Sequence, residues 1–205
     1  MKVKESPANA EAACEAAGKV RVRDRIFDTA CELFYQQGIR AVGVDAIACE
    51  AGTNKMSFYR SFASKDELVA EYLREAERNF WNRWDCVVAP YENDPRRQAE
   101  ALFEMFMDKP CGKTDRGCAM ANAAVEIREE EHPGLAVVRG HKSEIRRRFR
   151  KLAREMKARD PEALGDALTL LMQGAYSSLL VFPNKSGPAV NAARTARTLI
   201  EAHVD

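Results

Sequence analysis

One stretch of eleven residues, from Ala48 to Phe58, constrains the fold of this chain more than any other feature of its sequence. Ala48 is small enough for a close crossing of two helices, and Gly52 can adopt a positive φ at no steric cost, which allows a sharp turn. Phe58 is expected to face Ile47, with Phe62 one turn further along the same side of the helix. The spacing therefore predicts two short helices joined by a tight turn around a small apolar core.

The helix expected from about Lys55 to Ser61 has a polar side that faces away from this core. Asn54 precedes it and can cap its free backbone amides. A short exposed helix of this kind fits the major groove of DNA, so we interpret the stretch as a helix-turn-helix whose second helix contacts DNA. The residues expected at this surface are Asn54, Lys55, Met56, Ser57, Tyr59, Arg60 and Lys65.

The charge around this stretch has the sign that DNA contact requires. The whole chain has a net charge of +1, but residues 18–65 hold eight Lys and Arg side chains against five Asp and Glu side chains, a difference of +3. Lys65 stands at the start of the next helix, beside backbone N–H groups that suit a phosphate. The alternative is a tight helical hairpin without DNA contact, but the cap and the cations favour the DNA-binding interpretation.

Most of the remaining chain also has the apolar spacing of helices. Ala30 and Phe34 recur on one face of a helix that Gly38 is expected to end. Ser64 opens a long helix, in which it is expected to form a capping box with Glu67. Other helices are expected at 45–51, 55–61, 96–107, 116–129, 134–158, 161–181 and 188–203. No stretch alternates like a strand, so the sequence predicts an all-α fold of about nine helices.

These elements divide into two predicted domains after a terminal tail. Residues 1–17 are rich in Ala and Glu without apolar periodicity and are expected to be disordered. Residues 18–65 are expected to form a three-helix DNA-binding domain, and residues 66–205 a larger helical domain.

Composition excludes several other classes of protein. Hydrophobic residues make up 46% of the chain, and no apolar run reaches the roughly 18 residues that span a bilayer. Without a signal peptide, a cytoplasmic protein with no membrane contact is expected. The six cysteines form no C-x-x-C pair and are expected to be free thiols. The three histidines lack metal-ligand spacing, and no catalytic triad can be assembled, so no metal, cofactor or enzymatic site is predicted.

Residues 21–68 resemble the DNA-binding domain of the tetracycline-repressor (TetR) family. The matching residues are Arg25, Ile26, Ala30, Leu33, Phe34, Gly38, Val44, Ile47, Ala48, Ala51, Gly52 and the runs 58–62 and 64–68. A weaker resemblance to the ligand-binding half continues over 117–182, through residues 117–119, 122–126, 132–133 and 174–175. The resemblance implies a homodimer, a double-stranded DNA operator with two-fold symmetry, usually repression, and release by a small molecule bound in the C-terminal domain.

Large apolar side chains of adaptable shape are frequent between residues 80 and 180. Most are expected in the core, but in a regulator of this family some would line a cavity for a small, mainly apolar effector. The candidate ligand-binding residues are Trp81, Trp84, Phe103, Phe106, Met107, Cys118, Asn122, Glu126, Met172, Gln173 and Tyr176. Cys118 is either a sensor of thiol-reactive compounds or a small residue at the start of a helix.

Two apolar stripes near the C-terminus are expected to form the homodimer interface. They consist of Leu164, Leu168, Leu171, Ala175 and Leu179 on one helix and of Val190, Ala193, Ala196 and Ile200 on the next. Two such helices can meet their symmetry mates in a four-helix interface, and small residues favour their close approach. The alternative is that both helices pack only within one subunit.

Two other functions stay open at the level of sequence: a helical enzyme, and a protein–protein adaptor that uses the helix-turn-helix for another partner. A basic run at 146–159 suggests a second nucleic-acid surface, but apolar residues at helical spacing within it favour an ordinary solvated helix face. The identity of the effector, the operator sequence, and the choice between repression and activation are not encoded in any recognisable motif.

Overall fold

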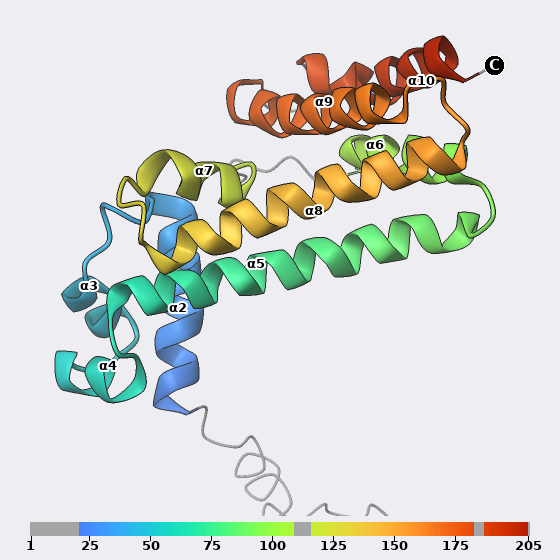
Figure 1. Ribbon diagram of the computed structural model, residues 1–205. Coiled ribbons are helices and arrows are strands. Elements are labelled where there is room, and N and C mark those ends of the chain that lie inside the picture. Colours follow the sequence, from blue (N-terminus) through green and yellow to red (C-terminus); the bar gives the residue numbers. More distant parts are fainter. Residues whose placement is uncertain (1–20, 109–115, 183–186, 205) are drawn as a thin grey trace, which may run out of the picture.

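The computed structural model describes residues 21–108, 116–182 and 187–204 of the 205-residue chain, which form an all-α fold (Figure 1). Nine α-helices lie in these ranges, in agreement with the prediction. They are α2 (Val22–Gln37), α3 (Val44–Glu50), α4 (Lys55–Ser61), α5 (Lys65–Val88), α6 (Pro95–Asp108), α7 (Ala119–Glu126), α8 (Pro133–Glu155), α9 (Pro161–Val181) and α10 (Ala192–His203). Short 3₁₀ turns occupy Ala89–Tyr91 and Pro188–Asn191. The predicted disordered tail, residues 1–17, lies outside the described residues.

The first helix boundaries lie where the sequence places capping residues. The Asn54 side chain accepts a hydrogen bond from the Ser57 backbone N–H at 3.0 Å, and Ser64 Oγ accepts one from the Glu67 N–H at 3.1 Å. The second of these bonds is one half of the predicted capping box. Gly38 ends α2 with a φ of 95°, which residues with a Cβ atom rarely adopt. Local signals therefore explain where α2, α4 and α5 begin or end.

Three later helices, α7, α8 and α10, are shorter than predicted, whereas α9 has the predicted bounds. Within the predicted range 116–129, α7 covers only Ala119–Glu126, because Gly117 turns the chain with a φ of 73°. The end of α8 is at Glu155, where the chain turns through Lys157 with a φ of 57°. α10 begins only after a 3₁₀ turn. Each difference lies at a helix end, where the spacing of apolar residues gives the least information about the helix bounds.

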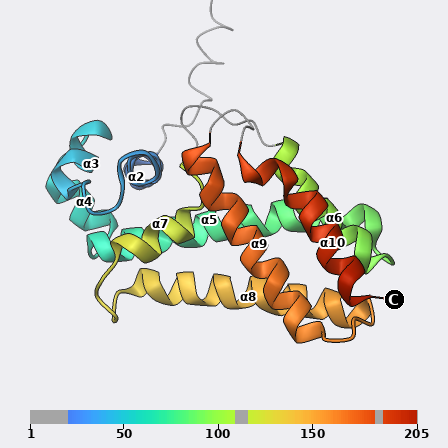
Figure 2. The ribbon, with the colours of Figure 1, turned by 90° about the horizontal axis from the view of Figure 1, so that it is seen from above.

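Two long helices, α5 and α8, form the axis of the molecule. They run side by side in the same direction, and the helix-turn-helix unit of α2, α3 and α4 lies at their N-terminal ends (Figure 1 and Figure 2). α9 and α10 form a second layer that covers α8 and α6 (Figure 1). Because α5 runs unbroken for 24 residues, it spans about 36 Å and connects the helix-turn-helix unit with the C-terminal layer.

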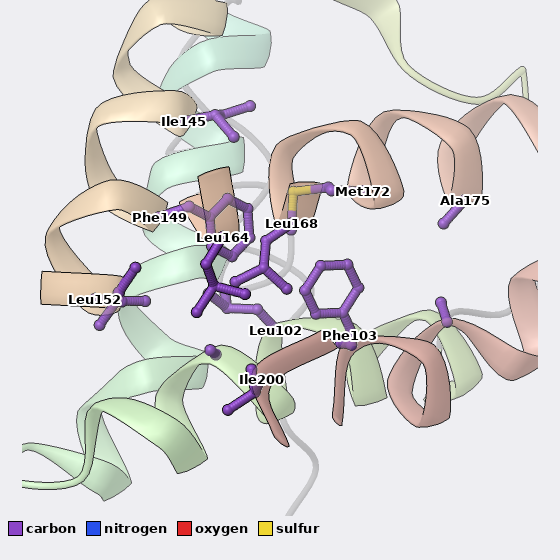
Figure 3. Packing of buried hydrophobic residues seen from close by; sticks show 14 of the residues in the cluster. Leu102, Phe103, Ile145, Phe149, Leu152, Leu164, Leu168, Met172, Ala175 and Ile200 are labelled. Carbon is purple, nitrogen blue, oxygen red and sulfur yellow. The ribbon is translucent and has the colours of Figure 1, made fainter. Parts of the chain in front are cut away.

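Two apolar cores lie along this axis. The N-terminal core contains Phe34 and Phe58 of the helix-turn-helix unit and also takes in Met120 from α7 and Val138 from α8. The C-terminal core joins α6, α8, α9 and α10, with Trp84 contributed by α5 (Figure 3). The residues that Figure 3 labels in this core are Leu102, Phe103, Ile145, Phe149, Leu152, Leu164, Leu168, Met172, Ala175 and Ile200.

Helices α8 and α9 cross at a glycine. A Cβ atom at Gly165 would lie 2.7 Å from the backbone Cα of Arg150, so a larger residue would clash there. The neighbouring Asp166 accepts bidentate hydrogen bonds from Arg146 at 2.7 Å and from Arg150 at 2.8 Å. These arginines of the basic run are therefore paired with an acid of α9, which agrees with a solvated helix face and not with a second nucleic-acid surface.

Gly165→Ala is expected to lower the free energy of unfolding by about 1–3 kcal/mol, because its methyl group would meet backbone atoms that cannot easily move aside. Gly140→Ala on α8 is the matched control. A Cβ atom at Gly140 has nothing within 4 Å, and alanine should there stabilise the helix by up to about 1 kcal/mol. Urea unfolding measures both changes; equal stabilities of the two variants would contradict the close crossing.

Candidate DNA-binding surface and ligand cavity

The helix-turn-helix is fixed by a glycine turn and by a buried aromatic side chain on α4. Gly52 has a φ of 62°, as the sharp turn requires. Phe58 is fully buried in the N-terminal core together with Ile47 of α3, and its ring centre lies 5.8 Å from that of Phe62. α4 therefore has one anchored face and one free face.

The free face of α4 carries the side chains that the sequence suggests for DNA contact. Asn54, Lys55, Met56, Tyr59 and Arg60 are exposed, and Ser57 is half-buried. The exposed fractions of Met56 and Tyr59, 65% and 50%, are large for such side chains. Exposed apolar groups gathered on one short helix indicate a surface that a partner covers.

The cations near α4 have different surroundings. Lys55 Nζ is paired with Asp45 Oδ2 of α3 at 3.1 Å, and this hydrogen bond raises the pKa of Lys55. Arg60 is exposed, without an ion pair to any described residue. The Lys65 ammonium lies 6.0 Å from the centre of the Phe34 ring, and burial lowers its pKa. Arg60 is therefore free to meet a phosphate, whereas Lys55 must first leave Asp45.

A second site is a cavity of about 200 Å³ whose walls come from α2, α5, α7, α8 and α9. Side chains of both cores or their borders surround it, among them Tyr35, Tyr72, Phe80, Cys118, His141 and Tyr176. The walls are mainly apolar with a few polar groups, which is the usual composition of a small-molecule site.

Of the residues that the sequence suggests for ligand binding, Cys118 and Tyr176 line this cavity. Phe103 and Met172 are fully buried in the C-terminal core, and Trp84 is nearly so. Their assignment to the ligand site is wrong for this cavity, because these large side chains fill the protein interior instead.

Trp81 and Gln173 are not part of the cavity wall either. Trp81 is half-buried, and the Arg148 guanidinium lies 4.0 Å from the centre of its ring. Gln173 is half-buried on α9. The side chains of Phe106 and Met107 lie outside the described part of the chain.

The sequence analysis missed Tyr35, Tyr72 and His141 as cavity residues. Tyr72 has the spacing of a core residue, and Tyr35 stands on a helix assigned to DNA binding. A cavity formed where five helices meet leaves no periodic signal in any one of them. His141 does share the apolar face of α8 with Val138 and Ile145, and that spacing could have indicated a buried histidine.

His141 is buried, and its Nδ1 has no hydrogen-bond partner among the described residues. Its side chain is 1% exposed, and Glu77 Oε1 lies 3.6 Å from Nδ1, beyond hydrogen-bond range. The rings of Phe80 and Trp81 lie 4.7 Å and 5.3 Å from the imidazole. Burial, with a smaller contribution from the charge of Lys142, lowers the pKa of His141 to about 4. The imidazole is therefore neutral at pH 7, with unused hydrogen-bonding capacity.

Tyr35 joins the cavity wall to the helix-turn-helix unit. Its hydroxyl oxygen accepts a hydrogen bond from the Arg116 backbone N–H at 3.0 Å, and the hydroxyl donates to the Gly117 carbonyl at 3.3 Å. Gly117 directly precedes Cys118, which also lines the cavity. A change in this part of the wall therefore reaches α2 through one side chain.

Asn122 and Glu126, suggested as ligand-orienting residues, line a separate groove between α2 and α7. Asn122 Nδ2 donates to the Arg116 carbonyl at 2.8 Å, and Glu126 Oε2 accepts from the Arg40 backbone N–H at 2.9 Å. A Cβ atom at Gly38 would lie 2.9 Å from the same oxygen of Glu126. Glu126 thus holds α7 against the chain that follows α2, and Asn122 holds the turn before α7; neither is part of the cavity wall.

Most of the predicted dimer stripe lies inside the subunit. Leu164, Leu168, Ala175 and Ile200 are buried in the C-terminal core (Figure 3). Leu179 and Ala196 are buried in the same core. A side chain that is buried within its own subunit cannot contact a second subunit. The predicted place in the dimer interface is therefore wrong for these six residues. Leu171, Val190 and Ala193 are half-buried and keep some surface.

The outer side of α9 carries exposed apolar residues instead. Leu170 is 70% exposed and Val181 is 69% exposed. A groove of about 320 Å³ adjoins Leu170 and includes Gly174 and Pro188, and a Cβ atom at Gly174 would have nothing within 4 Å. We call the surface of Leu170, Gly174 and Val181 the outer α9 face.

Fold and site together define an all-helical protein with an N-terminal helix-turn-helix and a cavity-bearing helical part. The family model "Bacterial regulatory proteins, tetR family" matches residues 26–72. Residues 26–72 are therefore similar to the DNA-binding part of TetR-type bacterial regulatory proteins.

Among curated relatives, the HTH-type transcriptional repressor KstR2 of Rhodococcus jostii is 36% identical over 88 residues, which cover 43% of this chain and 43% of that protein. KstR2 of Mycobacterium tuberculosis is 35% identical over 88 residues, 42% of this chain and 44% of the relative. The chain thus matches less than half the length of these relatives.

Similarity to solved structures extends over most of the chain. A TetR-family transcriptional regulator from Streptomyces coelicolor has a TM-score of 0.76 at 26% identity, covering 88% of this chain and 93% of that one. A putative TetR transcriptional regulator from Streptomyces avermitilis has a TM-score of 0.74 at 29% identity, covering 89% and 98%. The C-terminal helices therefore share the fold of these regulators.

The burial of His141 predicts a loss of stability in acid. Because its pKa in the folded chain lies below the ordinary value of 6.5, the unfolded chain binds the proton more readily. The stabilisation that comes from the neutral His141 is fully present above pH 6.5 and is lost as the pH falls to about 4. The free energy of unfolding should fall there by up to about 1.4 kcal/mol per pH unit for this one group.

Urea unfolding between these pH values measures the slope, and His141→Phe is the control that removes the titrating group. The variant should lose part of the pH dependence. An unchanged slope in His141→Phe would contradict the assignment of this proton to His141.

Proposed function

We propose that this protein is a dimeric transcriptional repressor that binds a two-fold symmetric DNA operator through α4 and releases it when a small molecule fills the cavity. The observation that carries the proposal is the two-sided α4: Phe58 anchors one face in the core, while Met56 and Arg60 are presented to solvent on the other. A helix of this size fits the major groove. The description of KstR2 as a repressor supports repression as the output.

Selection of bound sequences from random DNA tests this function directly. A two-fold symmetric sequence is expected, with half-sites about 34 Å apart, one turn of the double helix, or a multiple of that distance. A single unsymmetrical site would contradict the dimeric binding mode. No enrichment at all would favour the alternative function, a protein adaptor that uses the exposed face of α4.

Arg60→Ala and Lys65→Ala are expected to weaken binding to all DNA sequences alike, because both residues flank the groove-facing part of α4 and meet phosphates. Each change should flatten the log–log salt dependence by about one unit for every phosphate interaction that it removes, and by twice as much in a dimer. Lys151→Ala is the matched control, since Lys151 is paired with Glu155 at 3.6 Å in the last turns of α8, away from α4 (Figure 1). Loss of affinity for one operator variant alone, with an unchanged salt slope, would indicate base contacts instead.

The outer α9 face is the proposed dimer interface. It presents exposed Leu170 and Val181 beside a groove, and this combination is unusual on a surface that stays in water. A second copy of the same chain would cover it with two-fold symmetry, the symmetry that the proposed operator needs. Gly174 would allow two copies of α9 to approach closely, because open space lies above it.

Leu170→Glu is expected to separate the dimer without unfolding the subunit, because Leu170 is mainly exposed. Leu168→Glu, two positions earlier on α9, should instead unfold the subunit, since it would bury a carboxylate at a cost of several kcal/mol. Sedimentation velocity and circular dichroism distinguish the two results. A wild-type monomer at micromolar concentration, or a dimeric Leu170→Glu, would overturn the assignment of this face.

The cavity is the proposed effector site, and two helices connect it with α4. Tyr35 of α2 and Tyr72 of α5 line the cavity, and both helices pack in the N-terminal core. Because α5 is unbroken, a tilt at the cavity moves its N-terminal end and changes the separation of the two α4 helices in a dimer. A preference of about 1–3 kcal/mol for the tilted state would release the operator about 5- to 150-fold.

A further inference from the structure

Cys118 combines a cavity position with a positively charged environment. It is the N-cap residue of α7, beside the free amides of the helix N-terminus, and it lines the cavity. Lys142 Nζ lies 3.9 Å from Cys118 Sγ, and Lys142 has no carboxylate partner among the described residues. A helix N-terminus and a neighbouring ammonium both favour the thiolate, which is the nucleophilic form of cysteine.

His141 is a second polar group in the wall of this cavity. It directly precedes Lys142 on α8 and is 1% exposed, and its Nδ1 has no hydrogen-bond partner among the described residues. Buried polar atoms without a hydrogen-bond partner are rare in folded proteins. A neutral imidazole has one N–H to donate, which suits the carbonyl oxygen of a bound molecule.

We propose that Cys118 is a covalent modification site for small soft electrophiles, in particular α,β-unsaturated carbonyl compounds that enter the cavity. The thiol site does not depend on DNA. The further statement that its adduct acts as an effector rests on the proposed function.

The reaction is a conjugate addition in which atoms and electrons balance. The Cys118 thiol first loses its proton to solvent, with the thiolate held beside the Lys142 ammonium. The sulfur then forms a bond to the β-carbon, the carbon–carbon π bond breaks, and the electron pair moves toward the carbonyl oxygen, where His141 donates a hydrogen bond. Water returns a proton to the α-carbon, so no oxidant or reductant is needed.

The other described cysteines provide internal controls. Burial and the nearby charges of Asp28, Glu75 and Glu71 raise the pKa of Cys31 to about 12, so this thiol is unreactive at neutral pH. Cys49 and Cys86 are exposed on α3 and α5, respectively, and neither is part of the cavity wall. Accessibility alone would therefore direct an electrophile to Cys49 and Cys86, whereas the proposal directs it to Cys118.

The test treats the full chain with limiting methyl vinyl ketone and follows each cysteine by peptide mass spectrometry. At pH 7, Cys118 is expected to react at least about fivefold faster than Cys86, because it lies in the cavity wall beside the Lys142 ammonium. A Cys118 rate equal to or below that of Cys86 would overturn the proposal.

Two variants separate this site from simple exposure. Lys142→Gln should slow alkylation of Cys118 several-fold and leave Cys86 unchanged, and Lys142→Arg should restore most of the rate. Equal slowing of both cysteines would point to unfolding and count against the assignment.

Operator binding then tests the effector role separately. Methyl vinyl ketone should lower the operator affinity of the wild-type protein and of Cys86→Ser, but should not change that of Cys118→Ser. Rapid alkylation of Cys118 without any change in operator affinity would support the modification site and reject its regulatory role. Failure of any DNA to bind would reject the proposed function while the alkylation rates still decide the chemistry.

Discussion

The structure depends on α5, one continuous helix that contributes to both apolar cores. Leu68 and Leu73 are buried in the N-terminal core, and Trp84 is buried in the C-terminal core. Each fully buried side chain of this size contributes about 1.5–3 kcal/mol, so both ends of α5 are firmly held. The predicted domain boundary after residue 65 coincides with the start of α5, yet the N-terminal core continues past it to Met120. The helix-turn-helix unit is therefore oriented by a shared core and not by a flexible linker.

The helix-turn-helix was predictable from sequence because its determinants act over a few residues. Gly52 sets the turn, Asn54 caps α4 and Phe58 anchors it, and each signal is local. The cavity was not predictable in the same way. Its wall includes Tyr35 and His141, which are far apart in sequence and carry no common pattern. Aromatic and methionine content indicates that a large core exists, but it does not show which side chains leave a space between them.

The dimer stripe shows a second limit of sequence periodicity. A helical apolar stripe identifies the side that avoids water, but not whether the same chain or another chain covers it. On α9, Leu168 belongs to such a stripe and is covered by the subunit's own core, whereas Leu170 lies outside it and is exposed. An exposed apolar side chain outside the stripe, such as Leu170, therefore says more about assembly than the stripe itself. Its significance becomes visible only when burial within the subunit has been measured.

In the proposed function, the cavity would link stability to regulation through one residue, His141. Leaving the buried His141 without a hydrogen-bond partner costs the empty protein about 1–3 kcal/mol. A molecule that forms this hydrogen bond recovers the free energy on binding, and the recovered free energy adds to its affinity. If the cavity wall can relax around Tyr35, the same free energy biases α2 and α5, which pack with α4 in the N-terminal core. Coupling between two sites is reciprocal. In the proposed function, DNA that holds α4 in place must therefore oppose filling of the cavity to the same extent that filling opposes DNA binding.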